Sequence, residues 1–87
     1  MRVEEHYASN DGTGVRAVLK RVGDEYLLIV VNENPYGVTF TVSGLPAALD
    51  GRVMNRTGEG VHPTVGGRAL TDGIRAYDVH LYTPDRP

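Results

Sequence analysis

The segment from Tyr26 to Ser43 constrains the fold more than any other part of this chain. Two runs rich in Val, Ile, Leu and Thr, 26–31 and 38–43, flank a loop of sequence Asn-Glu-Asn-Pro-Tyr-Gly. Aliphatic and β-branched residues favour strands, whereas Asn, Pro and Gly favour turns. We therefore predict a β-hairpin in which Val31 lies opposite Val38. Its core face is expected to consist of Leu27, Ile29, Val31, Val38, Phe40 and Val42.

A further strand is predicted at Val15–Val22, and the turn after it decides which side chains share a face. A two-residue turn places Lys20 opposite Leu27 and Arg16 opposite Val31. A three-residue turn, 23–25, places Leu19 and Ala17 opposite Ile29 and Val31 instead. Because burying two cations is costly, we predict the three-residue turn.

The opposite face of this predicted sheet is half apolar. A solvated face of a sandwich is normally polar, so we interpret this face as a surface covered by another domain or subunit. Ordinary β-propensity of Val and Leu is the alternative interpretation. The predicted docking face consists of Val18, Val22, Tyr26, Leu28 and Val30.

The rest of the chain reads as short strands separated by turns. They are expected at Arg2–Ala8, Asp50–Asn55, Val61–Val65, Arg68–Thr71 and Ala76–Tyr82. Residues 1–14 form either a lead-in or an edge strand, and 83–87 form a polar tail. Seven or eight short strands with turns every 8–12 residues predict a single all-β domain over 1–87, a small antiparallel β-sandwich.

Composition excludes several classes of protein. The 87 residues include no Cys, so no disulfide or thiolate metal site is expected. The net charge of −2 and the dispersed basic residues argue against nucleic-acid binding. No apolar run approaches the roughly 20 residues of a membrane span, and the first residues do not form a signal peptide. The compartment stays open between the cytoplasm and the bacterial exterior.

Catalytic and metal-binding motifs are missing from the sequence. Ser9 and Ser43 lie outside a nucleophile elbow, and most carboxylates fall in predicted turns. His6, His62 and His80 lack the local spacing of metal ligands. We therefore expect a non-catalytic domain without a metal or a cofactor.

The aromatic residues make carbohydrate binding an alternative function for this chain. Exposed rings stack on sugar rings, and the sequence contains five Tyr and one Phe but no Trp. The candidate stacking residues are Tyr26, Tyr36 and Tyr82. A carbohydrate-binding module requires these rings to form one exposed platform.

The final predicted strand, Tyr77 to Tyr82, has the pattern Tyr-x-Val-His-x-Tyr. With Val31-Asn32 and Gly44-Leu45-Pro46 before it, it resembles the C-terminal all-β accessory domain of glycoside hydrolases whose catalytic domain is a TIM barrel. The resemblance covers about 15–82, and Ala76 departs from it where many relatives have Pro. It implies a non-catalytic domain that packs against the barrel and stabilises it. A carbohydrate-binding module and a stand-alone protein-interaction domain are the alternatives.

Overall fold

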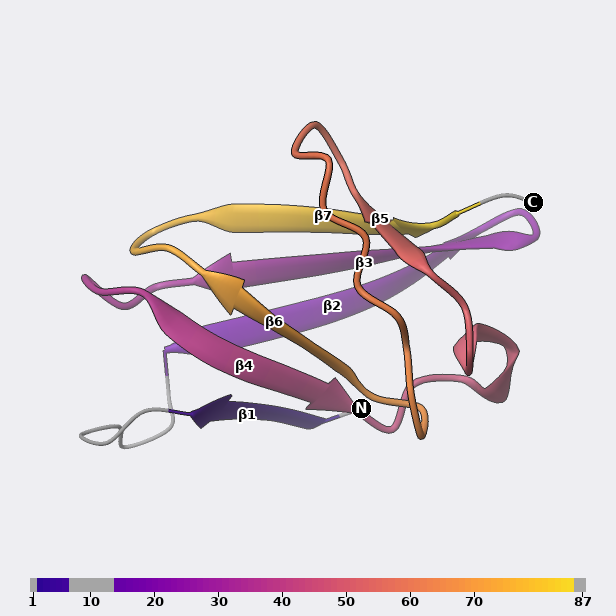
Figure 1. Ribbon diagram of the computed structural model, residues 1–87, viewed down its shortest axis with the longest axis horizontal. Helices are drawn as coiled ribbons and strands as arrows, with labels where there is room; N and C mark the ends of the chain where they lie inside the picture. The colour runs from indigo at the N-terminus through magenta and orange to yellow at the C-terminus, as the bar shows by residue number, and fades with distance from the viewer. Residues whose placement is uncertain (1, 7–13, 86–87) are drawn as a thin grey trace.

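The computed structural model describes residues 2–6 and 14–85, which form two antiparallel β-sheets (Figure 1). One sheet has the strand order β1–β4–β6 and the other β2–β3–β7–β5. The strands are β1 (Arg2–His6), β2 (Val15–Val22), β3 (Glu25–Asn32), β4 (Val38–Ser43), β5 (Met54–Arg56), β6 (Leu70–Ile74) and β7 (Val79–Pro84), with a short 3-10 helix, η1 (Ala47–Leu49), before β5. The predicted all-β antiparallel sandwich of seven or eight strands is confirmed.

Within the described residues, one hydrophobic core fills the space between the two sheets. The three-stranded sheet contributes Val38, Phe40, Val42, Leu70 and Ile74, and the four-stranded sheet contributes Val15, Leu28, Val30, Met54 and Tyr82. Leu45, Leu49 and Val65 from the connections join the same cluster. Within 2–6 and 14–85, no helix has the length and apolar character needed to cross a membrane.

The predicted hairpin of 26–43 is wrong, because β3 and β4 belong to different sheets. β3 pairs with β2 and β7, whereas β4 pairs with β1 and β6. Asn32, which is 1% exposed, holds the point where the chain crosses between the sheets. Its Nδ2 donates to the backbone oxygens of Tyr36 and Arg75, each at 2.9 Å. Its Oδ1 accepts from the backbone N–H of Asn34 at 3.0 Å.

The turn between β2 and β3 contains two residues, Gly23 and Asp24, rather than the predicted three. Gly23 has a φ of +60°, as the first position of a type II′ turn requires. Arg16 and Lys20 are exposed on the outer face of the sheet, so this register buries no cation. The prediction failed because it took the face of Leu27 as the core face.

The faces of β3 are the reverse of those predicted. Leu28 and Val30 are fully buried in the core, and Tyr26 is half-buried against it. Val18 is 50% exposed and lies on the outer face, opposite Ile29. The predicted docking face therefore mixes residues of both faces and is not one surface. The side chain of Val22 lies outside the described part of the chain.

The last strand begins later than predicted and extends further. β7 starts at Val79, and it includes Thr83 and Pro84, which the sequence assigned to a polar tail. Tyr77, predicted as part of this strand, precedes it and is 70% exposed. Tyr82 points inward instead and is fully buried. Beyond Asp85, the predicted tail lies outside the described residues.

The segment 61–65, predicted as a strand before a turn at residues 66–67, is not a strand in the structure, and the strand predicted at 68–71 begins later, as β6 at Leu70. Val61 and Thr64 instead bridge back to Arg56 and Val53. A tight turn does follow, one residue later than predicted, at Gly67 and Arg68. At the N-terminus, β1 (residues 2–6) is the predicted edge strand. Residue 1 and residues 7–13 of the predicted lead-in lie outside the described ranges.

Candidate functional site

Six polar side chains form a connected cluster where the two sheets meet beside a cleft of about 670 Å³. Three members come from β5 and β7 of the four-stranded sheet, one comes from β6 of the three-stranded sheet, and two come from the connections. We call this group the polar cluster; it consists of Arg56, Glu59, Asp72, Asp78, His80 and Tyr82. All of its members except Tyr82 line the cleft.

Tyr82 and His80 project inward from the same face of β7 because they are two residues apart on a strand. The Tyr82 hydroxyl donates a hydrogen bond to Asp72 Oδ2 at 2.7 Å, which joins the two sheets. The His80 and Tyr82 rings meet edge to face, with 5.7 Å between their centroids. His80 is 2% exposed, and only it and Asn32 are buried polar residues within the described ranges.

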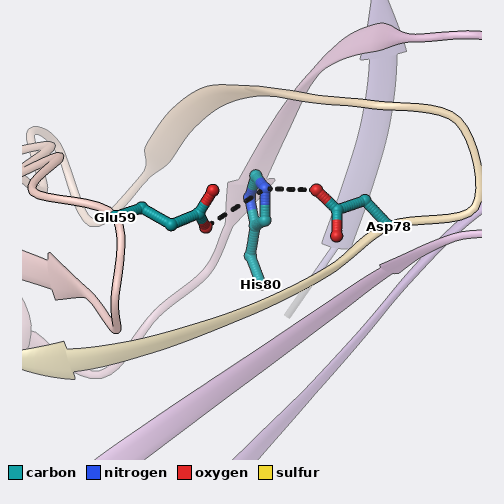
Figure 2. A group of neighbouring side chains, drawn as sticks. All are labelled: Glu59, Asp78 and His80. Carbon is teal, nitrogen blue, oxygen red and sulfur yellow. Dashed lines mark ion pairs between the residues drawn. The ribbon is translucent and has the colours of Figure 1, made fainter.

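The hydrogen bonds of Tyr82 fix the tautomer of His80. Because the phenolic proton is donated to Asp72, the Tyr82 oxygen accepts the hydrogen bond of 2.8 Å that joins it to His80 Nδ1. Nδ1 therefore carries a proton, and in a neutral imidazole Nε2 carries the free lone pair. Nε2 faces two carboxylates, Asp78 Oδ2 at 3.4 Å and Glu59 Oε2 at 3.8 Å (Figure 2).

Arg56 supplies the positive charge of the polar cluster and is largely enclosed. Its Nη1 donates to Asp72 Oδ2 at 2.9 Å, and its Nε lies 3.0 Å from Glu59 Oε2 in an ion pair that lacks hydrogen-bond geometry. Burial by itself lowers the pKa of Arg56, but the hydrogen bond and charge of Asp72 and the charge of Glu59 raise that pKa above its ordinary value. The guanidinium therefore stays charged.

Tyr82 is held in its neutral form by the same surroundings. Burial raises the pKa of Tyr82, and its hydrogen bond to Asp72 and the charge of Asp72 raise that pKa further, against the opposing charge of Arg56. A pKa raised on folding stabilises the native state below the pKa of the unfolded chain, and this stabilisation is lost as the pH rises toward the folded-state pKa.

We expect wild-type protein to lose stability more steeply in alkali than the Tyr82→Phe variant. Above about pH 10, the unfolded Tyr82 releases a proton that the folded residue keeps, which lowers the free energy of unfolding by about 1.4 kcal/mol per pH unit. Urea unfolding between about pH 9 and 11 measures this slope. Tyr77→Phe, at an exposed tyrosine, is the control and should keep the wild-type slope. Equal slopes for wild type and both variants would show that the pKa of Tyr82 is not raised on folding.

The outer face of the four-stranded sheet carries an apolar patch that spans three strands. Val18 of β2 pairs with Ile29 of β3, which pairs with Leu81 of β7. On the next row, Val31 pairs with Val79. Val18, Val79 and Leu81 are 50%, 51% and 40% exposed. We call this set, with the half-buried Leu27, Ile29 and Val31, the outer apolar face.

The three predicted sugar-stacking tyrosines do not come together. Tyr82 is buried in the core, whereas Tyr36 lies in the β3–β4 connection and is 39% exposed. Tyr26 is half-buried at the start of β3, with the guanidinium of Arg21 5.8 Å from its ring centroid. Tyr26 lies near the first end of the eight-residue β3 and Tyr36 lies beyond its last residue, so the two rings form no common platform.

Sequence reasoning missed the polar cluster because its members come from distant segments. Arg56 and Asp72 are 16 residues apart and Asp72 and Tyr82 are 10 apart. The one local signal was Asp78-Val79-His80, in which acid and imidazole alternate before a buried tyrosine. In comparisons with known proteins, no family model, no curated protein and no solved structure matches this chain.

Proposed function

We propose that this chain is a non-catalytic accessory β-sandwich that packs against a partner domain through the outer apolar face. The observation that carries the proposal is the continuity of that face across β2, β3 and β7. In a sheet with one solvated face, polar residues on that face alternate along each strand with apolar residues on the core face. Here both faces of β3 are apolar, as in a sheet that is covered on both sides.

Covering the outer apolar face supplies the energy of docking. Each 100 Å² of apolar surface removed from water contributes about 2.5 kcal/mol before the costs of association. Basic residues flank the face on β2, where Arg16 forms an ion pair with Glu33 at 3.0 Å and Lys20 is exposed. The partner that fits this surface is a folded domain with an apolar contact surface and an acidic group facing Lys20.

The partner in this proposal is the catalytic barrel of a glycoside hydrolase in the same polypeptide. The resemblance of segment 15–82 to the accessory domains of such enzymes supports this choice. The catalytic acids then belong to the barrel, and this chain stabilises it. A sugar-binding role has less support, because the tyrosines form no common platform.

Leu81→Asp is expected to weaken docking while leaving the isolated chain folded. Because Leu81 is 40% exposed, the isolated variant should keep its melting temperature to within about 5 °C. In the complete gene product, the same change places a charge in the interface, so this domain should melt separately from its partner. Calorimetry of both forms measures the difference.

Thr71→Asp is the matched control, because Thr71 is exposed on the other sheet. It should leave the melting of the complete gene product unchanged. The proposal is wrong if Leu81→Asp has equal effects in both contexts. It is also wrong if the gene encodes no further domain, or if the chain pairs with a second copy through this face.

A further inference from the structure

Three potential ligand atoms converge at the edge of the cleft. Glu59 comes from the turn after β5, Asp78 immediately precedes β7, and His80 lies on β7 (Figure 2). One ligand atom from each lies within 4.8 Å of the other two. The separation of 3.4 Å between His80 Nε2 and Asp78 Oδ2 already falls in the range of about 3.0–3.5 Å expected between ligands that lie about 2.1 Å from one metal ion.

His80 points an unused ring nitrogen at the two carboxylates. Its side chain is 2% exposed, and Nδ1 is hydrogen-bonded to the Tyr82 hydroxyl. Nε2 makes no hydrogen bond to the residues that the structure describes, and its contacts with Asp78 and Glu59 are ion pairs only if the imidazole is protonated. A lone pair on an almost fully enclosed imidazole that is aimed between two carboxylates is the arrangement of a metal ligand with two oxygen co-ligands.

Each of the three side chains is oriented by a partner outside the ligand set. Tyr82 fixes the ring of His80. Asp78 accepts the backbone N–H of Val79 on Oδ1 at 2.8 Å, which leaves Oδ2 toward Nε2. Glu59 is held by Arg56. Outer partners of this kind fix ligand orientation in metal sites and strengthen binding.

The charges of the polar cluster favour a divalent cation. Glu59, Asp72 and Asp78 carry three negative charges, and Arg56 carries one positive charge, which leaves a net charge of −2 when His80 and Tyr82 are neutral. A divalent ion balances this charge at the point where Nε2 meets the two carboxylates.

We propose that Glu59, Asp78 and His80 bind one divalent first-row transition metal ion, with zinc as the probe. An imidazole nitrogen favours this class of ion over magnesium or calcium, and carboxylates complete the set. Binding requires Glu59 to approach His80 Nε2 by about 0.3–0.8 Å from its 3.8 Å separation. Three protein ligands leave a coordination position open toward the cleft, which a water molecule or a small anion can fill.

Titration calorimetry of the chelator-treated chain with zinc chloride tests the proposal. We expect one zinc ion per chain and at least about tenfold weaker binding for Glu59→Gln and for Asp78→Asn. Both carboxylates are 39% exposed, so these variants should stay folded, which circular dichroism checks. Asp24→Asn, in the exposed β2–β3 turn, is the matched control and should bind zinc like wild type.

Two further measurements separate ligation from a structural role. Tyr82→Phe removes the partner of Nδ1 and should weaken zinc binding about tenfold. In ¹⁵N spectra, zinc should shift the Nε2 resonance of His80 while Nδ1 keeps its proton. The proposal fails if zinc does not bind one to one, or if it binds equally well to the Glu59→Gln/Asp78→Asn double variant. Neither result depends on the docking proposal, because the isolated chain is used throughout.

Discussion

Leu28→Asp is expected to leave the chain unfolded. Leu28 is fully buried at the centre of the four-stranded sheet, where it pairs with Leu19 and Tyr82. The change removes about 2–3 kcal/mol of apolar burial and adds the larger cost of a carboxyl group without a partner. A domain of this size has a total stability of only about 4–13 kcal/mol. Circular dichroism should therefore show the loss of the sheet signal.

Leu81→Asp in the isolated chain is the matched control for this prediction. Leu81 lies on the neighbouring strand but on the opposite face, where it is 40% exposed. The same substitution there should change the free energy of unfolding by less than about 1 kcal/mol. If the Leu28 variant folds and the Leu81 variant does not, Leu81 lies on the core face and Leu28 lies on the outer face, as the sequence predicted.

The sequence was sufficient to predict strands β2, β3 and β4 to within one residue, because strand formation there depends on local propensity. The prediction was wrong at 61–65, which is not a strand, and in the length of the turn after β2. The sequence was also sufficient for the core face of β4, where Val38, Phe40 and Val42 alternate with polar residues. The faces of β3 were not predictable in this way. Both Leu28 and its neighbour Leu27 belong to apolar sets, so alternation gives no preference for either face.

Local sequence patterns were not sufficient to predict the strand pairing or the polar cluster. A turn rich in Asn, Pro and Gly reverses the chain equally well within one sheet or between two sheets. The polar cluster depends on that choice, because Asp72 approaches Tyr82 only when their strands face one another in different sheets. The local spacing of His80 did not indicate ligands, because Glu59 comes from a turn 21 residues earlier.

Asn32→Asp is expected to destabilise the chain by about 3–5 kcal/mol, through the crossing between the sheets. Nδ2 of Asn32 donates to the backbone oxygens of Tyr36 and Arg75, both at 2.9 Å. An aspartate places an oxygen against both carbonyl oxygens at a site that is only 1% exposed. Each unsatisfied buried group costs about 1–3 kcal/mol, and the repulsion and the buried charge add to that cost. Urea unfolding at neutral pH measures the loss.

Asn55→Asp makes the same chemical change on β5, where the side chain is only half-buried. This control should lose no more than about 0.5 kcal/mol. The loss at Asn32 should also shrink in acid, because a protonated carboxyl group can donate a hydrogen bond to one of the two carbonyl oxygens. Equal losses at the two positions, or a loss at Asn32 that does not change with pH, would show that the Asn32 amide does not hold the crossing. The folding of β3 and β4 into separate sheets would then depend on core packing alone.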